Sequence, residues 1–253
     1  MRGLIRKYSF LCPQLYEWQQ SWRSQARRVL TSGVHESDFL FFRRYAAEAP
    51  AFLDVGGNIG QSINSIRNMV PYSRIVSFEP NPACYKQLRT LAGRIGRAEV
   101  FNCALGEEPG CVELHIPVAK SFVFSQLASL YPLSIRELVT ELNERGFSFV
   151  SESNLEIRRC RVDVHPLDSF DVQPDFVKID VEGAELSVLK GARRTIEQHR
   201  PVFLIEKGAR AEIAAFLASF GYRPFNYDSE RDRLVPFSTS GVNTFYIPDH
   251  KIS

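Results

Sequence analysis

Four carboxylate residues end or follow short apolar runs, where they could bind a polar ligand or move a proton. Asp54 and Glu79 end two such runs, and Asp180 and Glu182 follow a third. Because the carboxyl ends of parallel strands meet at one edge of a sheet, we expect all four side chains at that edge. Asp180 and Glu182 could act as a general base, orient an acceptor or bind a divalent ion through oxygen. Structural alternatives are that Asp180 caps the following helix and that Lys178 pairs with a buried acid.

A glycine-rich turn follows the first apolar run, in the sequence Asp54-Val-Gly-Gly-Asn-Ile-Gly60. Glycines let the backbone bend sharply and approach a ligand closely, because they lack a Cβ atom. The spacing is not the GxGxxG of dinucleotide sites, and an acid before the first glycine does not suit a pyrophosphate. It suits a cationic or zwitterionic ligand, such as the aminoacyl part of S-adenosylmethionine. The alternative is a tight strand–helix turn that binds nothing.

Two further strand ends lie where the rest of such a ligand would bind. Glu79 is placed to accept hydrogen bonds from both hydroxyls of a ribose, although a surface glutamate before a proline turn is the alternative. At the end of the next strand, Asn102 could bond to an adenine ring. Cys103 and Ala104 could form a shallow apolar wall beside that ring.

The elements that must position these residues are short apolar runs that alternate with helical segments from residue 51 onward. This alternation is typical of βαβ units around a parallel sheet. We predict strands at 51–55, 74–78, 99–102, 175–179 and 201–205, with closing strands near 223–227 and 244–247. We predict helices at 59–69, 82–92, 184–196 and 209–220.

Two segments fall outside this alternation. Residues 1–50 are predicted to form a helical lead-in that packs on the core or, as its basic and aromatic residues also allow, lies on a membrane or partner. Residues 51–253 then form one domain. Within it, 118–157 is predicted to be an insertion of a helix and loops between extra strands at 111–116 and 158–164. Long insertions in α/β enzymes usually carry substrate recognition or a lid.

Composition and charge restrict the class of protein. With 253 residues, 44% of them hydrophobic and 24% charged, the chain has the balance of a soluble globular protein with one sizeable core. A formal net charge of +2 gives little support to a nucleic-acid partner. The five cysteines have no zinc spacing, and we identify no metal site. We find no apolar run of membrane-spanning length and no good signal peptide, so we expect a cytoplasmic protein.

Several of these segments together resemble the FkbM family of S-adenosylmethionine-dependent methyltransferases. The resemblance covers roughly residues 50–208, and its most specific part runs from Lys178 to Gly191. The matching segments are 54–60, 77–82, 102–106, 166–170, 176–192 and 201–206.

The resemblance implies an α/β fold of the Rossmann-like class I methyltransferase type, with a mostly parallel central sheet and helices on both faces. It implies methyl transfer, usually to oxygen, on a sugar, glycan, lipid or secondary metabolite. It also implies that Asp54, Gly56, Asn58 and Gly60 hold the amino-acid end of the cofactor and that Glu79 holds its ribose. Gly57 stands where the family more often has alanine.

The acceptor is expected to be a small molecule or a saccharide, chosen by the parts that the resemblance does not cover. Aromatic residues of the insertion could form platforms for a saccharide, although aromatics in such segments more often belong to a core; they are Phe122, Phe124, Tyr131, Phe147 and Phe149. Glu206 is a further acidic candidate at the same sheet edge. His165 could be a base, although a lone histidine at a strand end is more often structural. The other histidines, His35 among them, have no supporting context.

Two alternative functions compete with methyl transfer. A nicotinamide-dependent oxidoreductase shares the doubly wound sheet and the acid after its second strand, but it would need the GxGxxG loop. A non-catalytic protein could have kept the fold and the cofactor, although intact Asp54, Glu79, Asp180 and Glu182 argue against it.

Overall fold

The computed structural model describes residues 33–120, 122–130, 134–144, 146–206, 210–238, 241 and 243–252. Most of the predicted helical lead-in, residues 1–32, lies outside the described residues. In the remainder of that lead-in, a 3₁₀ helix, η2 (Ser37–Tyr45), packs against the core. No helix among the described residues combines the length and the apolar character needed to cross a membrane.

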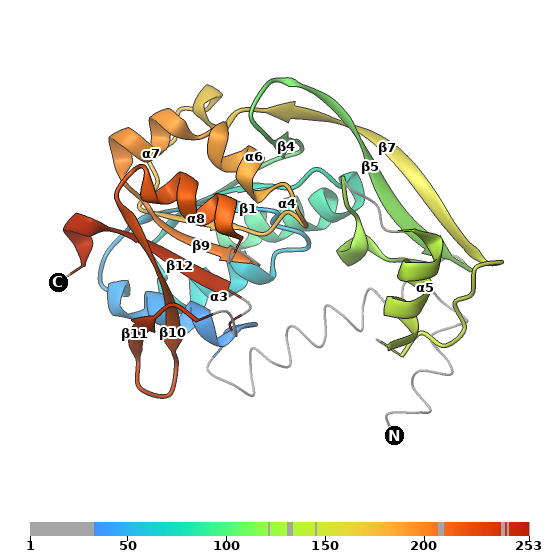
Figure 1. The fold of residues 1–253 in the computed structure, drawn as a ribbon, viewed down its shortest axis with the longest axis horizontal. Coiled ribbons are helices and arrows are strands. Elements are labelled where there is room, and N and C mark those ends of the chain that lie inside the picture. Colours follow the sequence, from blue (N-terminus) through green and yellow to red (C-terminus); the bar gives the residue numbers. More distant parts are fainter. Residues whose placement is uncertain are drawn as a thin grey trace.

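Eight strands of the described residues form one central sheet, in the order β11-β10-β12-β9-β8-β1-β2-β3. Figure 1 shows this sheet with the helices around it. Five of its strands are mutually parallel: β1 (Ala51–Val55), β2 (Arg74–Phe78), β3 (Ala98–Phe101), β8 (Phe176–Ile179) and β9 (Val202–Glu206). Three antiparallel strands close one edge: β10 (Tyr222–Asp228), β11 (Arg233–Pro236) and β12 (Asn243–Pro248). The strand order reverses at β1, which pairs with β2 on one side and β8 on the other. Ligands bind at such a switch point in open α/β sheets.

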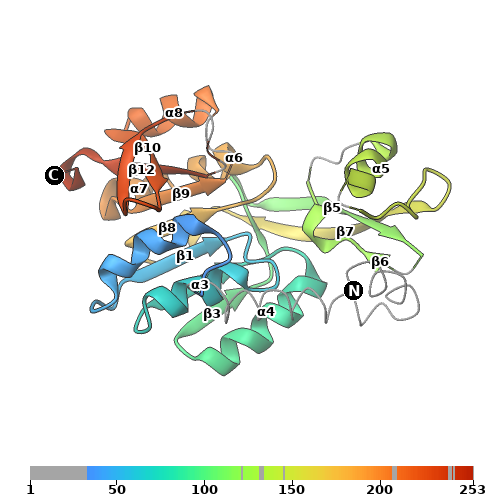
Figure 2. The same cartoon turned by 90° about the horizontal axis from the view of Figure 1, so that it is seen from below.

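Helices cover both faces of this sheet (Figure 2). On one face lie η2, α3 (Gln61–Met69) and α4 (Pro82–Ile95), and on the other lie α6 (Glu185–Lys190), α7 (Arg193–His199) and α8 (Ala211–Ala218). Successive residues of a strand point to opposite faces, so Phe52 packs in the core under η2, α3 and α4, whereas Leu53 packs in the core under α6, α7 and α8. A parallel strand covered on both sides needs a continuous apolar run, which is why these strands were readable in the sequence.

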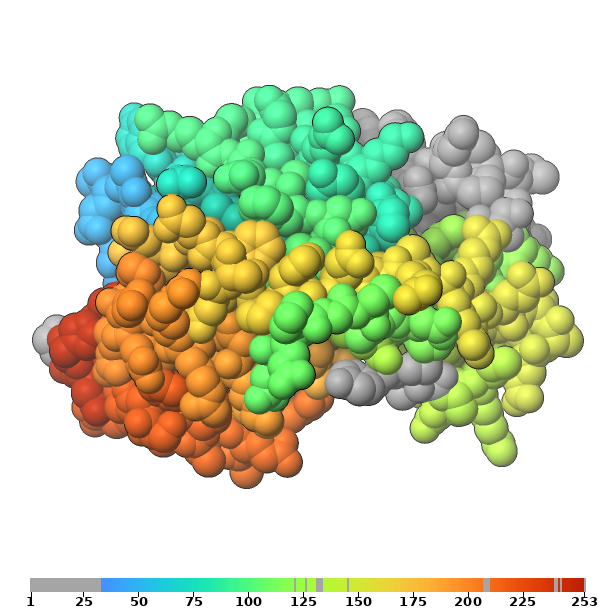
Figure 3. Space-filling model, turned by 90° about the horizontal axis from the view of Figure 1, so that it is seen from above, coloured from blue at the N-terminus to red at the C-terminus, as the bar shows by residue number. Residues whose placement is uncertain are grey.

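A second sheet, of order β4-β7-β5-β6, projects from the central one. Its strands are β4 (Ala104–Leu105), β5 (Gly110–Ala119), β6 (Phe122–Val123) and β7 (Leu155–His165). Its far end, together with η3 (Ser125–Leu127) and α5 (Ile135–Glu144), makes up what we call the lobe, residues 119–157. The lobe forms one end of the molecule, and the C-terminal helices and strands form the other (Figure 3). Two short 3₁₀ turns, η4 (Leu167–Ser169) and η5 (Asp249–Lys251), complete the fold.

The structure confirms the predicted α/β class and places every predicted strand within a few residues. It corrects three details. The strands expected at 111–116 and 158–164 are longer and pair with each other outside the central sheet. The predicted insertion therefore contains strand ends as well as a helix and loops. The helix expected at 184–196 is two helices, and the strands β4, β6 and β11 were not predicted.

Candidate active site

A cavity of about 440 Å³ opens at the carboxyl edge of the parallel strands, a volume typical of small-molecule sites. The turn after β1 and the ends of β2, β8 and β9 form one wall, and residues of β5 and the lobe form another. Six of the predicted site residues line it: Gly56, Asn58, Glu79, Cys103, Asp180 and Glu182. The other three, Asp54, Gly60 and Asn102, do not line it.

The glycine turn is tied to both neighbouring strands. The amides of Gly56 and Gly57 both donate to the carbonyl of Phe78, at 2.9 and 3.1 Å. Gly56 has a φ of +83°, and a Cβ there would lie 1.8 Å from the carbonyl oxygen of Asp180. Only glycine therefore fits between the ends of β1 and β8. Asn58 is also left-handed, with a φ of +48°.

Glu79 is a buried carboxylate at the end of β2, with 6% of its surface exposed. Its Oε2 accepts from the amide of Asn58 and its Oε1 from the amide of Asn81, each at 2.7 Å. Burial raises the pKa of Glu79 to about 7, although the two amides and Lys178 favour the charged form. Each oxygen keeps a lone pair for a further donor, as a ribose diol requires.

Asp54 and Lys178 form a buried ionic brace beneath the turn. Asp54 has no exposed surface, and its Oδ2 accepts from the Ser77 hydroxyl at 2.8 Å. The ammonium of Lys178 lies 3.6 Å from Asp54 Oδ1 and 3.1 Å from Asp180 Oδ2, and it donates to the carbonyl of Gly56. Burial alone would lower the pKa of Lys178, but the carboxylates of Asp180 and Asp54 outweigh it and raise the pKa.

The residues after β3 have two roles, because Asn102 supports the turn after β2 and Cys103 lines the cavity. The side-chain amide of Asn102 donates to the carbonyls of Glu79 and Pro80, so it fixes the turn after β2. Cys103 lines the cavity beside Ala104 and Leu105. Burial, and then the charge of Asp163, raise the pKa of Cys103 to about 11, so the side chain presents a neutral thiol to the cavity.

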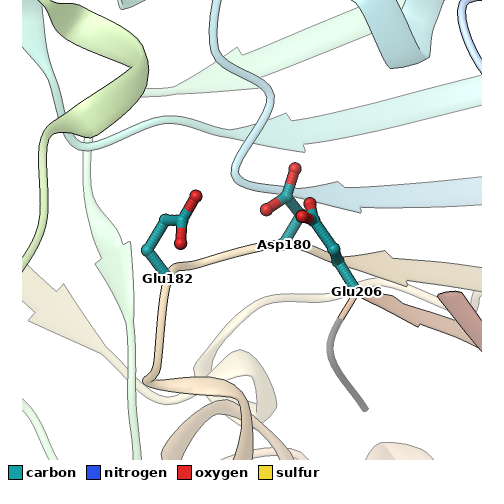
Figure 4. A group of neighbouring side chains, drawn as sticks. All are labelled: Asp180, Glu182 and Glu206. Atoms are coloured by element: carbon teal, nitrogen blue, oxygen red, sulfur yellow. The ribbon is translucent and has the colours of Figure 1, made fainter. Parts of the chain in front are cut away.

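Three carboxylates gather at the ends of β8 and β9. Asp180, Glu182 and Glu206 each have an oxygen within 4.8 Å of the others, and they lie close together in Figure 4. Glu182 sits in a left-handed turn, with a φ of +50°. Asp180 does not cap the next helix, because the N-cap of α6 is Ala184. Such a cluster can share a proton or bind a divalent cation through oxygen.

Sequence reasoning missed one part of the wall. His35 and Glu36, just before η2, line the cavity together with Gln61 and Ser62 from the first turn of α3. The Nδ1 of His35 lies 2.7 Å from the Ser65 hydroxyl. No motif of the sequence indicated this approach, because it depends on how η2 packs.

For the four described phenylalanines of the insertion, the structure confirms a core role and not a saccharide platform. Phe122 and Phe124 are buried in the core of the lobe, with Phe147 and Phe149 packed against that core, and none of the four lines the cavity. A lobe that projects from the sheet needs its own core, and these side chains supply it. Tyr131 lies outside the described residues. His165 also does not line the cavity.

Comparisons with known proteins find a family model and relatives that are methyltransferases. A family model described as "Methyltransferase FkbM domain" matches residues 54–224. Methyltransferase sdnD of Sordaria araneosa is 30% identical over 205 residues, which cover 73% of this chain and 76% of that protein. The 2-O-methyltransferase NoeI of Sinorhizobium fredii is 26% identical over 159 residues, 61% of this chain and 62% of that protein. The crystal structure of methyltransferase FkbM from Methylobacillus flagellatus aligns with a TM-score of 0.49 and 21% identity, over 78% of this chain and 43% of that one.

Proposed function

The chain belongs to the methyltransferase FkbM domain family, and from this premise we propose that its cavity binds S-adenosylmethionine and serves to methylate a hydroxyl group of a small-molecule or saccharide acceptor. The observation that carries the proposal is that one cavity is lined by the glycine turn, by the buried carboxylate of Glu79 and by the three carboxylates of Asp180, Glu182 and Glu206. The family match decides against a nicotinamide-dependent oxidoreductase. The name of the relative NoeI, a 2-O-methyltransferase, supports oxygen as the acceptor atom.

On the donor side, Glu79 accepts hydrogen bonds from the ribose hydroxyls, and Cys103, Ala104 and Leu105 provide the wall for the adenine. The turn at Gly56 and Asn58 lies against the amino-acid end. Asp54, Gly60 and Asn102 act behind this surface. Asp54 holds Lys178, Gly60 lets the chain turn into α3 with a φ of +96°, and Asn102 fixes the turn that carries Glu79.

On the acceptor side, the task of the chain is to align a hydroxyl and remove its proton. When bound, S-adenosylmethionine supplies a methyl group activated on a sulfonium sulfur. Lys178 holds Asp180 in place, so that this carboxylate can orient the hydroxyl. Glu182, whose carboxylate lies beside that of Asp180 on the cavity wall, takes the proton as general base. The lobe contributes Ser125 and Ser129 to the opposite wall, and we propose that this wall selects the acceptor.

Isothermal titration with S-adenosylhomocysteine tests the donor side. The wild-type protein should bind it, and Glu79→Ala should weaken binding by at least about tenfold, because hydrogen bonds to a charged group are lost. Glu99→Ala, which removes an exposed carboxylate from the neighbouring strand, is the matched control and should change nothing. A wild-type protein that does not bind S-adenosylhomocysteine contradicts the proposal.

Transfer of a labelled methyl group to a panel of saccharides and hydroxylated metabolites tests the acceptor side. Glu182→Gln should lower the rate of transfer by about a hundredfold or more while S-adenosylhomocysteine binds as before, because general-base catalysis contributes at least that factor. Transfer should also survive treatment with EDTA. Activity that EDTA abolishes and Mg²⁺ restores would instead assign the three carboxylates to a metal ion.

A further inference from the structure

Of the three clustered carboxylates, Glu182 is the one that the sheet does not position. The amide of Asp180 donates to the carbonyl of Val55 at 3.0 Å, and Glu206 is the last residue of β9. Glu182 lies in the turn beyond Asp180 (Figure 4), where its own φ is +50° and that of Gly183 is +110°. A left-handed conformation is unfavourable for glutamate and persists only where the surrounding structure holds it. The place of the Glu182 carboxylate therefore depends on the contacts of this turn.

Glu185 holds the turn from behind the cavity wall. It is the first residue of α6, only 1% of it is exposed, and it does not line the cavity. Its Oε1 accepts from the amide of Gly183 at 2.8 Å. That amide belongs to the peptide group that joins Glu182 to Gly183. The hydrogen bond therefore restricts the backbone conformation of Glu182.

Arg210 neutralises the buried carboxylate of Glu185. Among the described residues, the second oxygen of Glu185, Oε2, accepts no hydrogen bond. The Nη1 of Arg210 lies 3.5 Å from this oxygen and also donates to the carbonyl of Gly183 at 3.4 Å. A buried carboxylate needs such a cation, because an unpaired charge is very costly to bury. We call Glu185 and Arg210 together the clamp.

The clamp connects the two segments that carry Glu182 and Glu206. Arg210 is the N-cap of α8, four residues after Glu206, whereas Glu185 begins α6. From the lobe, the hydroxyl of Ser129 donates to the carbonyl of Glu182 at 3.5 Å. Neither residue of the clamp lines the cavity. The clamp can therefore affect a molecule in the cavity only through the turn that it holds.

We infer that Glu185 and Arg210 are positioning residues, which hold the turn so that the carboxylate of Glu182 meets that of Asp180 at the cavity wall. The inference rests on the proposed function, in which Glu182 takes the proton. Loss of the clamp should lower the rate of methyl transfer and leave affinity for the donor unchanged, because a displaced base removes the proton slowly.

Hydrogen exchange at the Gly183 amide measures the clamp without a methyl acceptor. Glu185→Ala removes the oxygen that binds this amide and should speed its exchange by about tenfold or more. Glu185→Gln keeps an oxygen there and should exchange as the wild type does. Arg210→Ala leaves the buried carboxylate unpaired and should speed exchange as well. Combining Arg210→Ala with Glu185→Gln should restore slow exchange, because no buried charge then remains.

Transfer from labelled S-adenosylmethionine to the panel of saccharides and hydroxylated metabolites measures the consequence for catalysis. Arg210→Ala should lower kcat by about tenfold or more, while calorimetry shows unchanged affinity for S-adenosylhomocysteine. The variant that combines Arg210→Ala with Glu182→Gln should be as slow as Glu182→Gln alone. Residues that act through one group are not additive, whereas a merely structural loss would multiply with it.

Arg231→Ala is the matched control, because Arg231 is another arginine paired with a carboxylate, that of Asp228, and neither residue lines the cavity. It should change neither exchange at Gly183 nor transfer. Equal exchange in the wild type and Arg210→Ala, or losses from Arg210→Ala and Glu182→Gln that multiply, overturn the inference. A wild-type protein that does not bind S-adenosylhomocysteine overturns the proposed function instead. Exchange at Gly183 needs no donor, so it separates the two failures.

Discussion

If Glu79 binds the ribose as proposed, affinity for the nucleoside should depend on pH near neutrality. Burial raises its pKa from 4.5 to about 7, and the ionised form is the better acceptor for two ribose hydroxyls. Affinity for S-adenosylhomocysteine should therefore rise between pH 6 and pH 8 and level off above. Calorimetry across this range measures it, and Glu79→Gln should give a flat profile. An equally steep profile in that variant would assign the titration to another group.

The raised pKa of Glu79 has the opposite effect on stability: affinity should rise with pH, whereas stability should fall. A carboxyl whose pKa is raised in the folded protein binds more protons there than in the unfolded chain at intermediate pH. The contribution of Glu79 to the free energy of unfolding therefore falls as pH rises from about 4.5 to about 7, and is constant above. Ionisation of Glu79 in the folded protein therefore lowers the free energy of unfolding, and a bound ribose would offset this loss.

Gly57 is required by its neighbours in this chain, although the family often has alanine at this place. A Cβ at residue 57 would lie 2.2 Å from the Ser77 hydroxyl. Gly57→Ala should lower the free energy of unfolding by about 1–3 kcal/mol, as overpacking does. Adding Ser77→Ala should recover part of that loss, because it removes the clashing oxygen. Urea unfolding of the single and double variants measures this coupling.

Gly93→Ala is the control for that experiment. Gly93 lies in α4, and a Cβ there would meet nothing within 4 Å. This substitution should stabilise the protein slightly, by up to about 1 kcal/mol, because alanine is the better helix former. Equal losses at both glycines would contradict the steric explanation for Gly57.

At the scale of elements, the junction of β1 and β8 depends on the brace between Asp54 and Lys178. Lys178→Met leaves a fully buried carboxylate without its cation and should cost about 3–5 kcal/mol of unfolding free energy. Lys178→Met with Asp54→Asn should recover much of it. Arg223→Met, which breaks the exposed pair with Asp249, should cost less than about 1 kcal/mol in the same urea titration. Similar costs for both single variants would contradict the brace.

The sequence predicts the elements of the central sheet well because buried parallel strands are short, apolar and separated by helices. It does not predict the break between α6 and α7, since that break has a distant cause. Gly191 packs so closely on the segment after β4 that a Cβ would lie 1.9 Å from the carbonyl of Gly106. The separate sheet of β5 and β7 was missed for a similar reason, because strand partners are a non-local property.

At the scale of the molecule, the lobe has its own core and should lose its structure independently. Leu142 is buried in the core of the lobe, whereas Leu217 is buried in the central core. Leu142→Ala should speed hydrogen exchange in the lobe, while the central sheet stays protected and S-adenosylhomocysteine binds. Leu217→Ala, a matched truncation, should destabilise the central sheet. Uniformly faster exchange in both variants would show a single cooperative unit.

The candidate site was predictable where one strand end follows another in a motif, as at Gly56, Glu79 and Asp180. The candidate site was not predictable where residues far apart in the sequence come together to cover it. His35 and Glu36 reach the cavity only because η2 packs on α3 and because Asn243, some 200 residues later, holds Glu36. No local pattern records such a contact, whereas the pairing of Lys178 with a buried acid, here Asp54, was one of the alternatives that the sequence left open.

The acidic lining has a consequence for turnover. Among the described residues, five carboxylates face the cavity, and the cation among them, Lys178, is already paired with two acids. A sulfonium carries one more positive charge than the thioether it becomes, so each transfer cancels part of the attraction that held the donor. We therefore expect the spent nucleoside to leave more readily than the fresh one, with little product inhibition. The ratio of their two dissociation constants measures this bias.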